Sequence, residues 1–494
     1  MASDRSRPYR LLTGFLGLLM RAFFRRVEVI GLEHIPKTGG GIVVSWHPNG
    51  LVDPGLILTR LPRAVVFGAR HGLFNWPVLG ALLRALGTVP IYRAVDMKGG
   101  ADARREANAK SLEALSQQVA QGAFSALFPE GVSHDQPHLA KLKSGVARLY
   151  YHARARTPDA QVPPVIIPVG LHYDKKRVFR SRALVWFHAP MQLPAELDVT
   201  PAEAEDEEVA RARIHGLTQE IGRVLREVVH ATDDWQTHYT LHRARSLIRA
   251  ERAKRGGARS RKPLLADRTL GFARMHAAYN ARLHSHPERV AELRAHVEEY
   301  DETLRALGVQ DHELDAPPKH SSLTRATLLV GQVILVFVLL PPLLVFGYVI
   351  NGLTAAGVLA LSKLGASKKK DVATIKILTG GLLFPLTWGL AAMLGVFAHR
   401  QLHSLFPQIP DRPIFAAVSM VLLAIIGGLV ALRYLHLARS TIAAVKVRLT
   451  RARRKTHIAQ ALVERRELHD ALLEMAEGLQ LPGAVESDGT LSHG

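Results

Sequence analysis

Short apolar runs alternate with stretches of helical spacing over residues 27–194. The runs are partly β-branched and bounded by glycine or proline, namely Val27–Ile30, Gly41–Ser45, Ala64–Phe67, Ser125–Phe128 and Val165–Val169. Such runs are typical of strands buried on both faces. Between them, Ala109, Leu112, Leu115 and Val119 recur at helical spacing. The alternation predicts an α/β head built on a largely parallel sheet with flanking helices.

Amphipathic helices follow the predicted head. Apolar residues recur at three- and four-residue spacing over Ile214–Val228 and over Val290–Leu304, which is typical of helices with one solvated face. A basic stretch around Arg255–Gly257 links them, and a further amphipathic helix is predicted over Ala459–Leu479. From Pro482 onward we expect disorder.

Three long apolar runs lie between these helices. Ala326–Ser362 has 37 consecutive residues without Asp, Glu, Lys or Arg, and Ile377–Ala398 and Pro413–Leu432 are also uncharged. A helix needs roughly 20 apolar residues to cross a bilayer. The first run is long enough for two spans, and Pro341-Pro342 followed by Asn351-Gly352 offers places to turn. We therefore predict four membrane spans, with three as the alternative count. The competing interpretation, a buried helical hairpin in a soluble domain, is less favoured because three separate runs have this length.

The N-terminal apolar stretch Leu11–Phe24 resembles a signal peptide only superficially. Arg21 interrupts it, Arg25-Arg26 follows it, and no small-residue cleavage site appears. We predict an interfacial helix instead. The chain then divides into an interfacial N-terminal helix (1–26), an α/β domain (27–195), a basic helical region (196–325), a transmembrane region (326–435) and a basic helical tail (436–494).

The charge of the chain fits a membrane protein. There are 64 Lys and Arg against 43 Asp and Glu, a net charge of +21. The densest basic runs, Arg243–Lys262, Lys368–Lys370 and Lys446–Lys455, flank the predicted spans. Basic flanks lie on the cytoplasmic side and attract anionic lipids, so we predict an integral membrane protein with its head on the cytoplasmic face. Nucleic acid is the competing partner, but zinc-finger spacing is absent and aromatics are only 6%.

Candidate chemistry begins with a histidine. The chain has no cysteine, which excludes a cysteine nucleophile and a thiolate metal site. His47 follows a predicted strand on a Pro-Asn-Gly turn, with Asp53 six residues on. In this arrangement the carboxylate can accept from one ring nitrogen while the other faces a substrate.

Three further elements lie later in the chain. Phe128–Asp135 brings backbone N–H groups and the Ser133 hydroxyl to a turn after a strand, which suits a phosphate. Gly87–Arg93 delivers one arginine after a short strand, which suits a bidentate phosphate contact. Ile167–Gly170 ends a late strand.

The four elements, in this order, resemble the phospholipid/glycerol acyltransferase family over residues 27–173. The resemblance implies transfer of an acyl group from a thioester, acyl-CoA or acyl-carrier protein, to a hydroxyl of glycerol-3-phosphate or a lysophospholipid. By position it implies His47 as general base, Asp53 as its partner, Arg93 as a phosphate ligand, Glu130, Gly131 and Ser133 as the acceptor-binding motif, and Lys143 and Gly145 as the lysine and glycine that often follow.

One spacing departs from the family pattern. Five residues, not four, separate His47 from Asp53. The longer spacing and Phe-Pro-Glu-Gly-Val-Ser-His-Asp are similar to the branch that includes glycerol-3-phosphate and dihydroxyacetone-phosphate acyltransferases. Members of that branch carry C-terminal spans, and Lys370–Thr374 also resembles them.

The leading interpretation is therefore a membrane-bound O-acyltransferase of phosphatidic acid synthesis. Acyl transfer would be direct, because Gly131–Asp135 departs from the Gly-x-Ser-x-Gly elbow of serine hydrolases. His134 and His138 lack a third ligand at useful spacing, so we expect neither metal nor cofactor. A lysophosphatidate or other lysophospholipid acyltransferase is the alternative, and a non-catalytic lipid-binding scaffold is the competing class. The acceptor, the acyl-chain length and the donor stay open.

Overall fold

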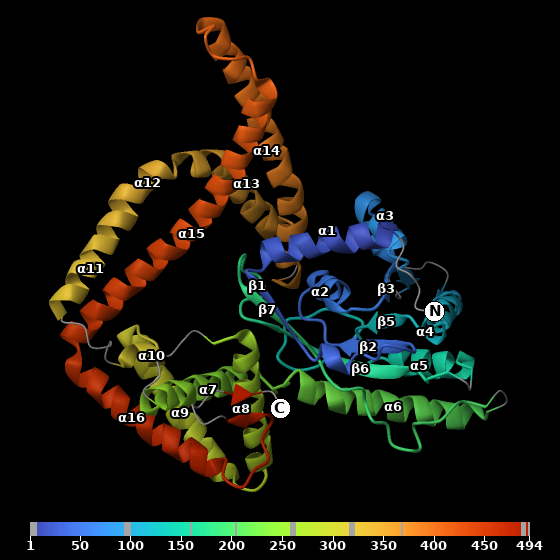
Figure 1. The fold of residues 1–494 in the computed structure, drawn as a ribbon. Helices are drawn as coiled ribbons and strands as arrows, with labels where there is room; N and C mark the ends of the chain where they lie inside the picture. Colours follow the sequence, from blue (N-terminus) through green and yellow to red (C-terminus); the bar gives the residue numbers. More distant parts are fainter. Residues whose placement is uncertain are drawn as a thin grey trace. The chain divides into compact units, whose positions relative to one another are not determined.

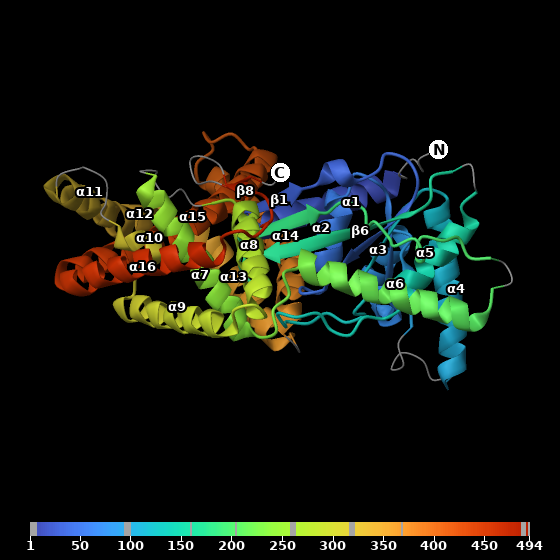
Figure 2. The same cartoon turned by 90° about the horizontal axis from the view of Figure 1, so that it is seen from below.

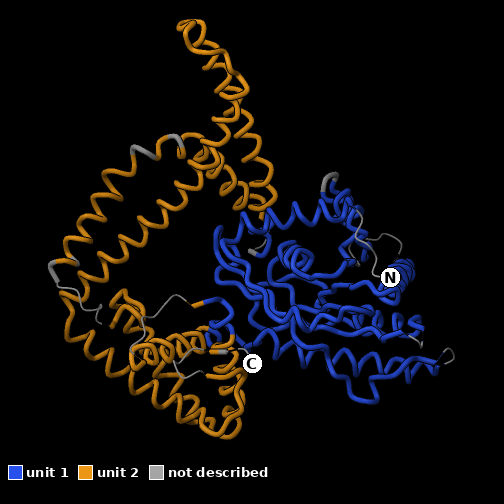
Figure 3. Tube along the Cα trace, in the orientation of Figure 1, with its two compact units in different colours: residues 1–238, 264–269, 368–374 blue, residues 239–263, 270–367, 375–494 orange. Residues whose placement is uncertain are grey.

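The chain forms two compact units. The computed structural model describes residues 7–92, 100–158, 161–202, 205–256, 263–315, 322–366, 369–485 and 491–492. Unit 1 comprises residues 1–238, 264–269 and 368–374, and unit 2 comprises residues 239–263, 270–367 and 375–494 (Figure 3). Two short segments from far along the chain thus belong to the same unit as the predicted head.

Unit 1 is built on one seven-stranded sheet with the order β1-β7-β6-β2-β5-β3-β4 (Figure 1). All neighbouring strands are parallel except β6 and β7. The strands are β1 (Arg26–Ile30), β2 (Gly41–Ser45), β3 (Val65–Arg70), β4 (Val89–Ile91), β5 (Phe124–Leu127), β6 (Val165–Tyr173) and β7 (Arg182–Phe187). The predicted α/β head with a largely parallel sheet is confirmed.

Strand β7 was not predicted from the sequence. It begins with Arg182, a charged residue that is unusual in an interior strand. The structure explains the exception, because buried Arg182 lies 3.5 Å from Asp174 and forms an ion pair with it. Strand β7 pairs with both β1 and β6 and so joins the first strand to the rest of the sheet.

Helices cover both faces of this sheet. They are α1 (Arg7–Phe23), η1 (Leu32–His34), α2 (Val52–Arg60), η2 (His71–Asn75), α3 (Pro77–Ala85), α4 (Gly100–Ala120), α5 (Gly145–Arg156) and α6 (Glu207–Val228). Figure 1 shows α1 and α2 on one side of the sheet and α5 and α6 on the other, and Figure 2 shows α6 lying across the second side. The apolar core between sheet and helices includes Ile42, Leu115, Leu149, Ile166 and Leu217.

Helix α1 presents two different faces. Tyr9, Met20 and Phe23 are buried in unit 1, whereas Leu11 and Leu18 are 76% and 60% exposed. Helix α2 approaches so closely that a Cβ at Gly55 would lie 3.1 Å from the Met20 methyl carbon. The second apolar face has no protein covering among the described residues of unit 1, as an interfacial helix requires.

Three helices of unit 2 are long and apolar enough to cross a bilayer. They are α13 (Val345–Leu364), α14 (Val372–Leu405) and α15 (Pro413–Arg453). The apolar segment Ala326–Leu339 is shorter and lies in α11 (Ser322–Ile334) and the π-helix Leu335–Leu339, which is followed by α12 (Leu340–Leu343). Among the described residues, the helix lengths therefore give the alternative count of three candidate spans.

The chain breaks near Pro341-Pro342 and not at Asn351-Gly352, which lie inside α13. The expected turn at Asn351 is wrong because tertiary contacts satisfy its polar side chain within the helix. The Asn351 amide donates to the Gly347 and Ala424 carbonyls and accepts from Trp388 Nε1. A buried amide with these partners can remain in a helix.

Most of the remaining described part of unit 2 is helical. Its elements are most of α7 (Trp235–Arg255) and α8 (Leu265–Leu283), then α9 (Pro287–Leu307), α10 (Asp311–Leu314) and α16 (Lys455–Met475). The predicted linker continues into residues 257–262, which lie outside the described residues. The expected disorder after Pro482 is wrong in part, because Ala484–Val485 and Leu491–Ser492 pair as antiparallel strands β8 and β9.

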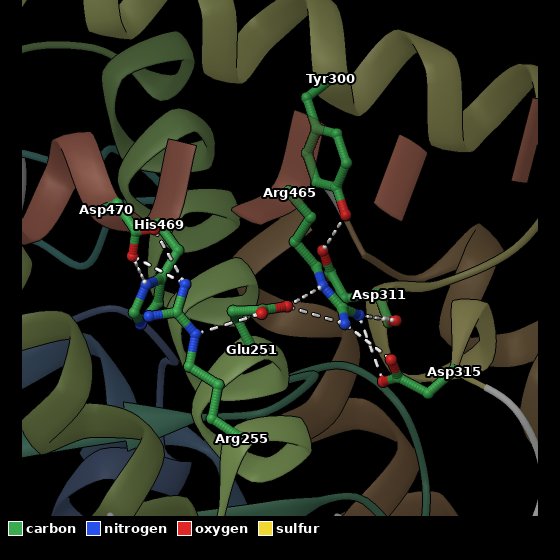
Figure 4. Close-up of polar contacts among 8 residues, drawn as sticks. All are labelled: Glu251, Arg255, Tyr300, Asp311, Asp315, Arg465, His469 and Asp470. Carbon is green, nitrogen blue, oxygen red and sulfur yellow. Dashed lines mark hydrogen bonds and ion pairs between the residues drawn. The ribbon is translucent and has the colours of Figure 1, made fainter. Parts of the chain in front are cut away.

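A buried arginine joins the helices of unit 2 (Figure 4). Arg465 on α16 is fully buried and donates to Glu251 on α7 at 3.0 Å and to Asp315 at 2.6 Å. It also donates to the Asp311 carbonyl. Tyr300 on α9 donates to the Asp311 carboxylate, and burial together with that carboxylate raises the pKa of Tyr300. One guanidinium therefore ties α16 to α7 and to the end of α10.

Replacing this arginine should destabilise unit 2. Arg465→Met keeps an unbranched apolar stem but leaves the Glu251 and Asp315 carboxylates without their cation. Breaking one partner of a buried ion pair costs about 3–5 kcal/mol, so we expect a fall of several degrees in the thermal midpoint of the detergent-solubilised protein. Arg289→Met is the matched control, because Arg289 pairs with Glu292 on an exposed helix face. Equal midpoints for the two variants would contradict the prediction.

Candidate active site

The site lies at the carboxyl end of the sheet. Strand β2 pairs in parallel with β5 on one side and with β6 on the other, with Val44 opposite Leu127 and Ser45 opposite Val169. Parallel neighbours end at the same edge, which is where open α/β sheets bind ligands. The loop with His47, the loop that begins at Phe128 and the end of β6 therefore come together.

His47 and Asp53 form the predicted pair. His47 Nδ1 lies 2.8 Å from Asp53 Oδ2, and the Asp53 side chain is fully buried while that of His47 is 18% exposed. The residues between them form a turn in which Gly50 has φ of 44°, and α2 then begins at Val52. The left-handed glycine absorbs the extra residue, so the longer spacing still gives a hydrogen-bonded pair.

Asp53 has two further donors. Its Oδ2 accepts from the Asn49 backbone N–H at 2.6 Å, and its Oδ1 accepts from the Tyr173 hydroxyl. Burial raises the pKa of Tyr173 well above its usual value, and the Asp53 charge adds to the effect, so the phenol stays protonated as a donor. A carboxylate only accepts, so His47 Nδ1 carries a proton and Nε2 is the nitrogen that can accept one.

Glu130 is buried between the two loops. Its side chain is fully buried, its Oε2 accepts from the His47 backbone N–H at 3.0 Å, and its Oε1 accepts from the Ala140 N–H at 2.8 Å. His134 Nε2 lies 2.5 Å from the same Oε1. The carboxylate is directed into the protein and connects the two loops, and its predicted role in binding the acceptor stays a prediction.

Two other contacts of the Phe128–Asp135 loop hold the histidine. The His134 N–H donates to the His47 carbonyl at 3.0 Å, so the main chain of His47 is bonded on both sides. The Phe128 ring stacks on the imidazole with centroids 4.1 Å apart and 12° between the planes. The stacking restricts rotation of the ring that must face a substrate.

Lys143 lies over the glycine of the Phe-Pro-Glu-Gly sequence. Gly131 has φ of 64°, and a Cβ there would lie 2.7 Å from Lys143 Nζ. The Lys143 N–H donates to the Pro129 carbonyl at 2.8 Å, and its side chain is exposed. The ammonium therefore sits at the turn that leads to half-buried Ser133, while Gly145 begins α5.

The other predicted residues are placed as follows. Arg93 lies outside the described residues. His138 Nδ1 faces the Asp233 carbonyl at 3.3 Å, separate from the His134–Glu130 contact. Within the described ranges, no group of three side chains is arranged to hold a metal ion.

Tyr173 is the functional residue that the sequence reasoning missed. It ends β6, three residues after Gly170 of the fourth element. A polar aromatic residue at the carboxyl end of a strand was the available signal. This signal identifies Tyr173 only when it is known that β6, and not another strand, lies beside β2.

The fold and the site define a class of protein that the comparisons confirm. Residues 26–172 match the family model described as Acyltransferase, which confirms over this segment the predicted resemblance to the glycerolipid acyltransferases. Residues 272–480 match a second family model, described as Glycerol-3-phosphate acyltransferase 2 C-terminal domain. The two matches follow each other along the chain, the first over the head and the second over the helical region after it.

Two known proteins are similar in sequence to parts of this chain. An uncharacterized acyltransferase of Schizosaccharomyces pombe is 25% identical over 61% of this chain and 54% of its own length. Glycerol-3-phosphate O-acyltransferase 1 of Saccharomyces cerevisiae is 26% identical over 53% of this chain and 34% of its own length. The chain thus spans about half of the first relative and a third of the second.

A solved structure also aligns with the chain. The 1-acyl-sn-glycerophosphate acyltransferase of Thermotoga maritima is 18% identical and covers 45% of this chain and 85% of its own, with a TM-score of 0.30.

The buried carboxylate gives a test of what Glu130 does. Glu130→Gln places an amide NH₂ among N–H donors, and leaving a buried donor unsatisfied costs about 1–3 kcal/mol. We expect a lower thermal midpoint of the detergent-solubilised protein. Ser133→Ala, on the same loop, should leave the midpoint unchanged. If Glu130→Gln unfolds at the wild-type temperature, Glu130 does not hold the two loops together.

Proposed function

We propose that this chain is a membrane-bound glycerolipid O-acyltransferase that moves a fatty acyl group from a thioester to the hydroxyl of glycerol-3-phosphate or dihydroxyacetone phosphate. The main observation behind this proposal is the His47–Asp53 pair. The buried Asp53 carboxylate accepts three hydrogen bonds, one of them from the His47 imidazole at the carboxyl end of the sheet. The match to the acyltransferase family and the name of the Saccharomyces cerevisiae relative support the acceptor class.

The chemistry is general base catalysis by His47. Nε2 takes the proton of the acceptor hydroxyl while that oxygen attacks the thioester carbonyl. Asp53 keeps the proton on Nδ1 and stabilises the imidazolium that forms. The new C–O bond replaces the C–S bond, and the proton passes from Nε2 to the departing thiolate.

The acceptor phosphate would bind at the turn after β5. Lys143 brings an ammonium to Gly131, and Arg93 would add a guanidinium by its resemblance to the second family motif. Gly131 and Ser133 shape the turn, and Glu130 positions His47 instead of touching the acceptor. A cationic turn beside a general base suits a phosphorylated alcohol.

The thioester donor is acyl-CoA or acyl-carrier protein. The chain has no cysteine, so a sulfur-bound acyl intermediate on the protein is excluded. Gly131–Asp135 also departs from the Gly-x-Ser-x-Gly elbow of serine hydrolases. We therefore take the acceptor oxygen as the nucleophile, and the reaction proceeds in one transfer.

His47→Ala tests the assignment of the base. We expect transfer of labelled acyl groups to glycerol-3-phosphate in membranes to fall by about 10²–10⁴-fold, the usual contribution of a general base. His138→Ala is the control, because His138 contacts the Asp233 carbonyl and neither His47 nor Asp53. The assay should include dihydroxyacetone phosphate and lysophosphatidate as acceptors. Wild-type rates in His47→Ala would exclude this residue as the base, and a preference for lysophosphatidate would replace the proposed acceptor.

We further propose that the head faces the cytoplasm. Residues 368–374, between α13 and α14, belong to unit 1 with the head, so this connector and the head are on one side of the membrane. The chain from the end of α10 to the connector then crosses an even number of times. The three long helices α13, α14 and α15 supply three crossings, so an even number requires a fourth. The shorter apolar segment Ala326–Leu339 is the candidate for it and would pair with α13, while α14 and α15 form the second pair. Basic residues before and after this region support a cytoplasmic location for the shared side.

Helix α1 supports contact of the head with the same leaflet. Leu11, Phe15 and Leu18 are exposed along one face, and Arg10 and Arg21 are exposed near them. Apolar and basic residues exposed together are typical of a helix lying on anionic lipid.

The absence of cysteine makes the topology directly measurable. Single substitutions at exposed positions, Gln161→Cys in the head, Gln408→Cys between α14 and α15 and Gln480→Cys after α16, would be treated with a membrane-impermeant maleimide in intact cells. We expect labelling of Gln408→Cys alone, and of all three after permeabilisation. The cysteine-free parent is the blank. Labelling of Gln161→Cys without permeabilisation, or opposite sides for residues 161 and 480, would contradict the arrangement.

A further inference from the structure

A short connector between two apolar helices reaches the catalytic loops. We define the connector as Lys369–Thr374, which comprises the 3-10 helix η5 (Lys369–Asp371) and the first turn of α14. Thr374 Oγ1 accepts from the Leu51 N–H at 3.2 Å, across 323 residues of sequence. Lys370 Nζ donates to the Ser133 carbonyl at 2.6 Å, across 237 residues. The connector therefore contacts both the His47–Asp53 turn and the turn after Gly131.

The threonine contact bears on the general base. Leu51 is the residue before α2, and Asp53 lies in the first turn of that helix. The first N–H groups of a helix lack partners within it, and the Thr374 hydroxyl supplies one here. The packing is close, because a Cβ at Gly50 would lie 3.0 Å from Thr374 Oγ1 and 3.4 Å from the Lys370 carbonyl oxygen. Thr374 thus holds the turn that sets the distance between His47 and Asp53.

The lysine contact bears on the acceptor. Lys143 lies over Gly131, and Lys370 binds the carbonyl of Ser133 two residues later, so two ammonium groups meet the same turn. The acidic groups of this loop are already engaged, because Glu130 accepts from the main chain and Asp135 forms ion pairs with Lys176 and Arg177. Lys143 and Lys370 thus bring two ammonium groups to this turn, to which a phosphate dianion is attracted. The connector also carries Asp371, whose Oδ1 would lie 3.6 Å from a Cβ at Gly50.

We propose that the connector completes the active site: Lys370 binds the acceptor phosphate together with Lys143, and Thr374 is a positioning residue for the His47–Asp53 pair. The inference rests on the proposed function, since it names the residues that hold the acceptor at that site. The two residues of this short segment have different roles. Lys370 binds the phosphate by its charge, and Thr374 fixes the geometry of the His47–Asp53 loop.

Kinetics of the full chain in membranes test the two roles separately. Lys370→Gln should raise KM for glycerol-3-phosphate by about 10–100-fold, the effect of one lost hydrogen bond to a charged group, with kcat within about threefold. Lys370→Arg should restore most of the affinity because it keeps the charge. Thr374→Val should lower kcat by about tenfold, as expected for a lost hydrogen bond that fixes the base, with KM unchanged, and Thr374→Ser should restore it.

A control variant and a binding assay distinguish failure of the connector proposal from failure of the proposed function. Lys363→Gln, on α13 outside the connector, should change neither constant. Calorimetric binding of glycerol-3-phosphate to the detergent-solubilised full chain should be weakened by Lys370→Gln and left intact by Thr374→Val. Wild-type binding in Lys370→Gln, or an equal KM change for glycerol-3-phosphate and for uncharged glycerol, would overturn the proposal. A wild-type protein that binds glycerol-3-phosphate but transfers no acyl group to it would overturn the proposed function alone.

Discussion

Parallel pairing of β2 with β5 and with β6 places three chain segments at one edge of the sheet. The site depends on this pairing, because His47, the Phe128–Asp135 loop and Tyr173 each follow or end one of these strands. Strand β2 is completely buried, so its register is fixed by packing on both faces. A shift of β2 by one residue would separate His47 from the groups that orient it.

Two buried carboxylates, those of Asp53 and Glu130, fix the position and orientation of His47 within this site. Asp53 orients the imidazole through Nδ1, and Glu130 holds the main chain of the same residue. Each accepts from backbone N–H groups as well as from side chains, so the cost of burying the charge is offset locally. His47, the proposed general base, is thus held at its ring and at its backbone by two different loops.

Unit 2 uses a buried charge for another purpose. Arg465 joins α16 to α7 and to the end of α10, so helices distant in sequence form one bundle. In the apolar helices, Asn351 plays a comparable part through the Ala424 carbonyl and Trp388. Close contacts add to it, because a Cβ at Gly347 would lie 2.5 Å from the Gly427 carbonyl oxygen. Polar groups in this unit therefore specify which helices meet.

The sequence by itself determined most of the strands, the apolar helices, the His47–Asp53 pair and the family resemblance, because hydrophobic period and local motifs depend on near neighbours in the chain. It did not determine strand β7, which begins with a charged residue. It did not determine that Glu130 faces inward, that Tyr173 meets Asp53, or that Lys370 and Thr374 reach loops 237 and 323 residues away. Those contacts follow from strand order and from the return of the connector to unit 1. Only the tertiary structure could decide them, since no local pattern records which distant segments become neighbours.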